Sequence, residues 1–222
     1  MSEAQGAQER HGPAPAEHFG SLAQETHAER LGMWIFLGSE SLLFAGLFTL
    51  YAAYRATYHN AFQLGIGEQY KLLGSLNTVI LLTSSLSAAL SVAAIERGHL
   101  KRGLLGVGVT VFFALSFLVI KISEYALHLE EGYRPGGWQL HDVSQTTLGL
   151  ESFFTLYYLT TGVHAVHVSI GIVVLSWLAL GLWRRTLRKP AVALELGVLY
   201  WHLVDVMWIF IWPLYYLAGG TH

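Results

Sequence analysis

The sequence predicts an all-α protein, an integral membrane bundle of five transmembrane helices. Of its 222 residues, 53% are hydrophobic and only 13% are charged, whereas roughly a quarter of the residues are charged in a typical soluble domain. After residue 30, long uncharged runs alternate with short polar links. A helix needs about 20 apolar residues to cross a bilayer, so composition and alternation both indicate a multi-pass membrane protein.

Residues 1–30 lack the apolar periodicity of a helix that buries one face. They are rich in Ala, Gln, Glu and His, and they include Pro13 and Pro15. Such a stretch buries too little apolar surface to fold by itself. It also lacks the cationic start and apolar core of a secretory signal. We therefore expect a polar, flexible N-terminal tail.

The transmembrane domain is expected to cover residues 31–219, followed by a short C-terminal end at 220–222. Its helices are predicted at about 31–54, 72–95, 104–128, 152–183 and 196–219. The third is the least clean, because its uninterrupted apolar part, Leu104 to Ile120, is near the lower length limit. Pro213 should kink the last helix near its outer end.

The distribution of Lys and Arg predicts the orientation, because positively charged short loops remain in the cytoplasm. With five spans, one side of the membrane carries Arg10, Arg30, Arg97, Lys101, Arg102, Arg184, Arg185, Arg188 and Lys189. The opposite side carries Arg55, Lys71 and Arg134, with Lys121 near its interface. This bias predicts a cytoplasmic N-terminus and a periplasmic C-terminus.

Composition also excludes several kinds of site. The chain contains no cysteine, which rules out disulfides, thiolate metal ligands and a cysteine nucleophile. The formal net charge is -2, and the basic residues lie in short clusters. A nucleic-acid-binding protein would instead present a continuous basic face, so no nucleic acid is expected as a partner.

Ionisable side chains inside the spans are the informative feature, since a charge near the bilayer centre costs several kcal/mol. They are Glu40, Glu124, His164, His167, His202 and Asp205. Helical spacing puts His164 and His167 on one stripe with Thr160 and Gly171, and it puts His202 and Asp205 on another with Glu195. A histidine opposite Asp205 or Glu40 would donate a hydrogen bond to the carboxylate and lower the cost of burying both groups.

The two histidines of the fourth span have two interpretations. Zinc or another metal needs three or four convergent ligands, and the three-residue spacing of His164 and His167 permits such a site without specifying it. The general rule that buried polar groups are hydrogen-bonded favours a buried polar seam. Glu40 is read either as a lipid or proton site or as a packing carboxylate kept neutral by burial.

Other polar and aromatic residues are assigned to helix packing or to the membrane interface. Small, hydroxyl and large aromatic residues are expected at helix contacts, namely Asn77, Ser84, Gly162, Gly171, Trp201 and Trp208. Lys121 and Glu124 are three residues apart near an interface, which favours a local ion pair or snorkelling. The Trp and Tyr residues of "MWIFIWPLYYLAG" are read as an interfacial aromatic belt.

Four stretches in order resemble subunit III of the haem–copper respiratory oxidases, the cytochrome c and quinol oxidases. They are "MWIFLGSESLLFAGLF" with its carboxylate at Glu40, "LNTVILLTSS", "IKISEYALHLEEG" with Glu124 and Tyr125, and "TGVHAVHVSIG" together with "YWHLVDVMWIFIWPLYYLAG". Val163 and Ala165 stand where the family often has an aromatic residue and a glycine. The chain resembles the shorter five-helix bacterial form, without the two N-terminal helices that help to form a phospholipid cleft in longer members.

The resemblance implies a non-catalytic subunit III of a proton-pumping terminal oxidase in the aerobic respiratory chain, in the bacterial cytoplasmic (inner) membrane. Such a subunit packs on the catalytic subunit I, contacts other oxidase subunits and membrane lipids, and supports proton uptake and stability there. It carries no catalytic residue and no metal. Haem and copper are expected in partner subunits, a bound phospholipid is a further expectation, and the electron donor is cytochrome c or quinol.

Three alternative functions remain beside this one. An accessory subunit of a nitric oxide reductase-type complex is the nearest, because it shares the five-helix pattern. A membrane metalloenzyme would use the histidines and carboxylates as ligands. A transporter or proton channel is the third, although the chain shows no inverted repeat and no pair of interrupted helices in matching halves.

Overall fold

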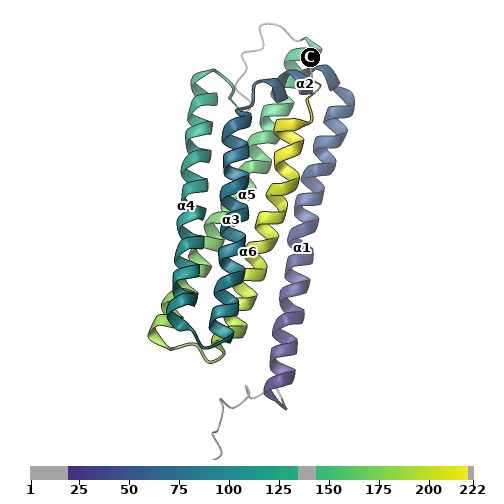
Figure 1. The fold of residues 1–222 in the computed structure, drawn as a ribbon. Helices are drawn as coiled ribbons and strands as arrows, with labels where there is room; N and C mark the ends of the chain where they lie inside the picture. Colours follow the sequence, from purple (N-terminus) through teal and green to yellow (C-terminus); the bar gives the residue numbers. More distant parts are fainter. Residues whose placement is uncertain (1–19, 135–143, 220–222) are drawn as a thin grey trace, which may run out of the picture.

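The computed structural model describes residues 20–134 and 144–219, which form an up-and-down helical bundle (Figure 1). Its helices are α1 (Leu22–Thr57), α2 (His59–Gly67), α3 (Lys71–Glu96), α4 (Leu100–Glu130), α5 (Gln145–Arg184) and α6 (Pro190–Trp212), followed by the π-helical turn η1 (Pro213–Leu217). Within these described residues, 5 helices are long and apolar enough to cross a membrane, with α6 and η1 counted as one. The predicted all-α, five-span architecture is confirmed.

Helix α6 lies at the centre of the bundle and packs against α1, α3 and α5. Helices α3 and α4 form the most extensive pair, and α4 also packs against α5. Helix α1 lies at one edge, where it contacts α5 and α6 (Figure 1). The polar side chains of α1, α5 and α6 can therefore meet at one junction, while those of α4 face α5 and the end of α6.

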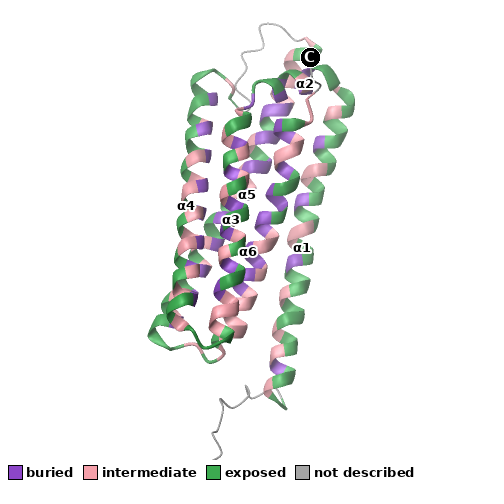
Figure 2. Cartoon of the chain, in the orientation of Figure 1, coloured by how far each residue is buried: buried purple, intermediate pink, exposed green. Residues whose placement is uncertain are grey.

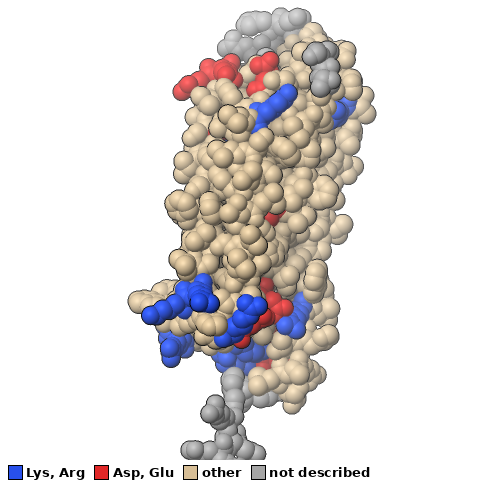
Figure 3. Space-filling view, viewed as in Figure 1, with Lys and Arg blue, Asp and Glu red and all other residues tan. Residues whose placement is uncertain are grey.

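The outer surface of the bundle is apolar along most of its length. Buried residues follow the inward faces of the long helices, and the outward faces are exposed (Figure 2). The exposed side chains include Leu42, Leu72, Phe112 and Val173, each more than 60% accessible. Figure 3 shows an almost uncharged midsection, with Lys and Arg gathered at the end where α1 begins. A surface of this kind suits lipid or another membrane protein, so the chain is a multi-pass membrane protein.

Helix α1 begins at Leu22, not at Leu31 as predicted from hydropathy. Ser21 caps the helix by accepting a hydrogen bond from the Gln24 backbone N–H. Farther along, Glu25 pairs with Arg188 of the α5–α6 turn at 2.5 Å. One turn later, Glu29 pairs with Lys189 at 2.8 Å. These two ion pairs hold the polar residues 22–30 in a helix that their apolar content does not predict. Residues 22–30 therefore belong to the helix, and residues 1–19 and 220–222 lie outside the described part.

The short helix α2 was not predicted, because a helix this short gives no spanning signal. It is stabilised by packing on α5, where a Cβ placed on Gly65 would lie 2.4 Å from the Phe153 ring. Phe62 and Ile66 of α2 are fully buried. At Pro213, where a kink was predicted, the α-helix gives way to a π-helical turn, since proline has no N–H to continue the ladder.

Candidate functional site

The junction of α1 and α5 holds a carboxylate–histidine pair. The Glu40 Oε2 atom lies 2.9 Å from His167 Nε2. The other ring nitrogen, His167 Nδ1, lies 2.8 Å from the backbone oxygen of Val163, one turn earlier on α5. Both side chains are partly accessible, His167 at 13% and Glu40 at 23%. The prediction that a histidine of this stripe meets Glu40 is confirmed for His167.

The hydrogen bonds of His167 limit where its protons can lie. A backbone carbonyl only accepts, so Nδ1 must carry a proton and donate it to Val163. The short contact between His167 Nε2 and Glu40 Oε2 then requires a second proton between those two atoms. Either neutral Glu40 donates to neutral His167, or protonated His167 donates to the Glu40 carboxylate. In both states the pair is electrically neutral overall, which lowers the cost of placing it within a bilayer.

His164 differs from its neighbour on the stripe. It is fully buried, and its ring lies against Phe117 and Trp208, with ring centroids 5.4 Å and 5.1 Å away. Neither ring nitrogen hydrogen-bonds to a described residue. The expected hydrogen-bonded seam therefore does not include His164, because aromatic rings from α4 and α6 fill the space where a carboxylate was expected.

The stripe predicted on the last helix does not meet the stripe on α5. His202 Nδ1 lies 2.7 Å from the Ser85 hydroxyl of α3. Asp205 is buried, and its carboxyl group interacts with the same Ser85 side chain and not with a histidine of the described residues. The predicted pairing of Asp205 with a histidine is wrong, because the rotation of α6 turns this face toward α3. Glu195 lies nearer the start of α6 and pairs with Arg30 at 2.7 Å.

A second polar cluster lies between α4, α5 and η1 and is wholly buried. The Lys121 ammonium donates hydrogen bonds to Glu124 Oε2 at 3.2 Å, to the Tyr157 hydroxyl at 2.9 Å and to the Tyr216 hydroxyl at 2.5 Å. Both hydroxyls donate in turn to Glu124 Oε1, at 2.8 Å from Tyr157 and 2.6 Å from Tyr216. Two tyrosines thus bridge the cation and the carboxylate, so the cluster is neutral and its donors are satisfied.

The buried cluster continues toward the end of the bundle through His128. His128 Nε2 lies 4.0 Å from Glu124 Oε1, and His128 Nδ1 lies 3.6 Å from Glu131 Oε2. Glu131 is half exposed and accepts a hydrogen bond from the Tyr70 hydroxyl at 2.5 Å. This bond raises the pKa of Tyr70 to about 12, because the acceptor carboxylate disfavours loss of the hydroxyl proton. His128 thus lies between the buried Glu124 and the half-exposed Glu131.

Sequence reasoning found part of this cluster and missed the rest. The ion pair between Lys121 and Glu124 was predicted and is confirmed, but snorkelling is wrong because both side chains are buried. Tyr157 and Tyr216 were missed. The last "YY" was read as part of an interfacial belt, whereas Tyr215 and Tyr216 are both fully buried. A lysine inside an apolar span was the available signal, since a buried cation requires hydroxyl or carboxylate partners from other helices.

Most of the residues predicted to pack helices lie at helix contacts. The Trp201 indole donates to the Ser84 hydroxyl at 3.2 Å, and the Trp208 indole donates to Thr78 at 3.0 Å. Gly171 allows α5 to approach α6, since a Cβ there would lie 2.7 Å from the Trp201 ring.

Two other residues of that set behave differently. Asn77 is fully buried, but its amide has no hydrogen-bond partner among residues 20–134 and 144–219. Gly162 is not at a contact, because a Cβ there would meet nothing within 4 Å. A helical pattern alone does not separate Gly162 from Gly171, since only the neighbouring helix distinguishes them.

In the part of the chain that the structure describes, no group of three or more His, Asp or Glu side chains is arranged to hold a metal ion. The Glu40–His167 pair supplies two such groups, and the buried cluster satisfies Glu124 with Lys121 and tyrosine hydroxyls. Both sites can therefore bind a proton or form hydrogen bonds.

Comparison with known proteins gives one consistent family. The family model described as "Cytochrome c oxidase subunit III" matches residues 18–220. Cytochrome c oxidase subunit 3 of Bacillus subtilis (strain 168) is 32% identical over 192 residues, covering 85% of this chain and 86% of that protein. Quinol oxidase subunit 3 of Bacillus spizizenii is 30% identical over 191 residues, with the same coverage. A haem–copper oxidase subunit I+III of Aeropyrum pernix is 30% identical over 198 residues, covering 85% of this chain and 22% of that protein.

Proposed function

Because the chain belongs to the cytochrome c oxidase subunit III family, we propose that it is the non-catalytic third subunit of a proton-pumping terminal oxidase. In this role it packs on the catalytic subunit I, supports proton uptake there and prolongs the activity of the complex. Haem and copper reside in partner subunits, and the electron donor is cytochrome c or quinol. The N-terminus lies in the cytoplasm, and a phospholipid is a further bound component.

The observation that carries the supporting role is the Glu40–His167 pair. Its hydrogen bonds require one proton between the two side chains, and it is partly accessible from outside the chain. A neutral pair that shares a proton can exist within the apolar part of a bilayer at low cost. Beside a partner subunit that takes up protons, the Glu40–His167 pair contributes either a local store of one proton or a fixed dipole. It does so without any redox chemistry.

Subunit I as the partner is supported by the relatives. One of them carries subunits I and III in a single polypeptide, and this chain aligns with 22% of its length. Fusion of two chains keeps them at high effective concentration, which is useful when the two parts contact each other. The apolar outward faces of the helices give such a partner a surface of suitable chemistry.

The proposal is tested by purifying the complex through a tag on this chain. We expect the haem-bearing catalytic subunit to copurify in a one-to-one ratio, with a visible spectrum of haem in the complex and with oxygen reduction as its activity. Copurification with a nitric oxide reductase in place of an oxidase would overturn the assignment. Stoichiometric haem or copper on the isolated chain would overturn the non-catalytic role.

A further inference from the structure

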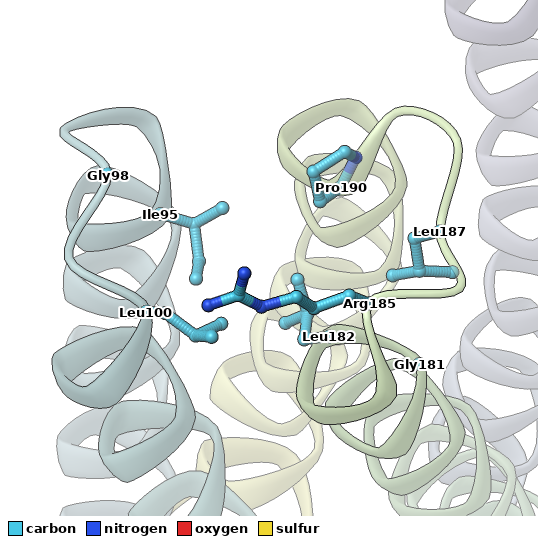
Figure 4. A pocket seen from close by; sticks show the side chains of 8 residues that line it. All are labelled: Ile95, Gly98, Leu100, Gly181, Leu182, Arg185, Leu187 and Pro190. Carbon is cyan, nitrogen blue, oxygen red and sulfur yellow. The ribbon is translucent and has the colours of Figure 1, made fainter.

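A pocket opens at the end of the bundle where the α3–α4 turn meets the α5–α6 turn. Its volume is about 310 Å³. The walls are mostly apolar, formed by Ile95, Leu100, Leu182, Leu187 and Pro190 with the glycines Gly98 and Gly181. The Arg185 side chain extends across it toward Leu100 (Figure 4). A cationic group thus lies over an apolar space, and we call this site the Arg185 pocket.

The backbone conformation of Arg185 is unusual for a residue that has a side chain. The residue follows the last residue of α5 and adopts a left-handed conformation with φ 56°. Glycine is the usual residue at such a helix end, because a side chain there carries an energetic cost. The turn is closed by the Thr186 N–H, which donates to the Gly181 carbonyl at 3.0 Å. Arg185 therefore carries a side chain at a position that glycine usually occupies.

The cations at and beside the pocket have no acidic partner among the residues that the structure describes. Arg185 lines the pocket, and four further cations lie within two residues of its lining residues in the sequence; we call the five the basic rim, namely Arg97, Lys101, Arg102, Arg184 and Arg185. None of them forms an ion pair with a described residue, and nearby Glu96 pairs with none of them. At the same end of the bundle, Arg188 and Lys189 are paired with Glu25 and Glu29. The protein thus neutralises one part of this end and leaves the rim around the pocket positive.

The position of the rim defines the chemistry of its ligand. It lies at the end of five membrane-spanning helices, where headgroups meet acyl chains. An inorganic anion would satisfy Arg185 but leave the apolar walls unfilled. A lipid with an anionic phosphodiester satisfies both, since guanidinium binds phosphate well and apolar walls accept hydrocarbon. The Glu40–His167 pair is not among the residues that line this pocket.

We propose that the Arg185 pocket binds an anionic glycerophospholipid, with its phosphate against the Arg185 guanidinium and the start of an acyl chain between the walls formed by Leu100 and Leu182. The basic rim attracts the headgroup, and the left-handed turn holds Arg185 over the pocket. This proposal specifies where the bound phospholipid of the proposed function lies, and it stands whether or not Glu40 takes part in proton uptake.

The test uses the purified complex that contains the full chain. Native mass spectrometry of the delipidated complex counts bound phosphatidylglycerol and phosphatidylcholine. Arg185→Gly removes the side chain and suits the φ of 56°, so the turn is preserved. Arg185→Gln removes only the charge and serves if the glycine variant does not assemble. Arg188→Gln is the matched control, because it removes one positive charge at the same end outside the pocket.

We expect the wild type to prefer phosphatidylglycerol, with affinity falling on the order of tenfold in both Arg185 variants and unchanged in the control. Equal binding by wild type and Arg185 variants, or equal binding of the two lipids, would overturn the proposal. Displacement of the lipid by inorganic phosphate alone would assign the site to a free anion. A photoreactive group at Leu187 should capture lipid, and capture of a partner subunit in its place would refute a lipid site.

Discussion

Lys121 and Glu124 lie one helical turn apart on α4 and face each other at 3.2 Å, with side chains 1% and 0% exposed. Removing water from two charges is expensive, and their attraction offsets that cost only when the remaining hydrogen bonds are also made. Here Tyr157 and Tyr216 make them. The pair comes from a single helix, but its stability depends on α5 and η1.

The first prediction concerns this ion pair. Lys121→Met alone leaves the Glu124 carboxylate buried without its cation, and Glu124→Gln alone leaves the ammonium unpaired. Each single change is expected to lower the unfolding free energy by about 3–5 kcal/mol. The double change should cost clearly less than the sum, because it removes both charges together. The unfolding free energy of all three variants is measured in mixed micelles of a mild detergent and dodecyl sulfate. If the loss in the double variant equalled the sum of the two single losses, the two side chains would not be coupled.

The second prediction concerns the tyrosine bridge. Tyr216→Phe removes the hydroxyl that joins Lys121 to Glu124, and both groups are too deep to gain water in its place. We expect a loss of about 1–3 kcal/mol. Tyr54→Phe is the control, since the Tyr54 side chain is 42% exposed and stacks on Tyr58. If the two variants unfold at the same detergent concentration, the Tyr216 hydroxyl does not stabilise the cluster.

The third prediction concerns the proton-sharing pair. The Gln side chain of Glu40→Gln can still donate a hydrogen bond to His167 Nε2, but it cannot release a proton. Glu40→Ala removes the contact altogether. In the oxidase complex we expect both variants to keep their haem content and initial rate, and to lose activity several-fold faster during turnover. Glu130→Gln, at the exposed end of α4, should behave as wild type. Wild-type lifetimes in both Glu40 variants would reduce Glu40 to a packing residue.

The fourth prediction contrasts two glycines of α5. A Cβ at Gly171 would lie 2.7 Å from the Trp201 ring, whereas a Cβ at Gly162 would meet nothing within 4 Å. Gly171→Ala should therefore destabilise the chain by about 1–3 kcal/mol through overpacking. Gly162→Ala should be neutral or stabilising by up to about 1 kcal/mol, because alanine is the better helix former. Thermal unfolding of the two variants side by side gives the comparison, and similar melting temperatures would contradict it.

Much of the fold follows from hydropathy alone, because burying a backbone in lipid demands helices and fixes their approximate length. What hydropathy missed are elements held by contacts with other helices. The first turns of α1 are polar and are held by ion pairs to Arg188 and Lys189. Helix α2 is held by packing on α5. Neither signal is present in the local sequence.

Hydropathy, motif order and residue spacing are enough to predict the architecture, the family resemblance and the set of ionisable residues inside the membrane. They do not determine the partners of these residues, because helical periodicity gives the face of a residue but not the rotation of the helix that meets it. Packing between the helices is what brings His167 to Glu40, places His164 among aromatic rings and turns His202 toward Ser85. It also brings Tyr157 and Tyr216 to Lys121, from positions 36 and 95 residues away along the chain.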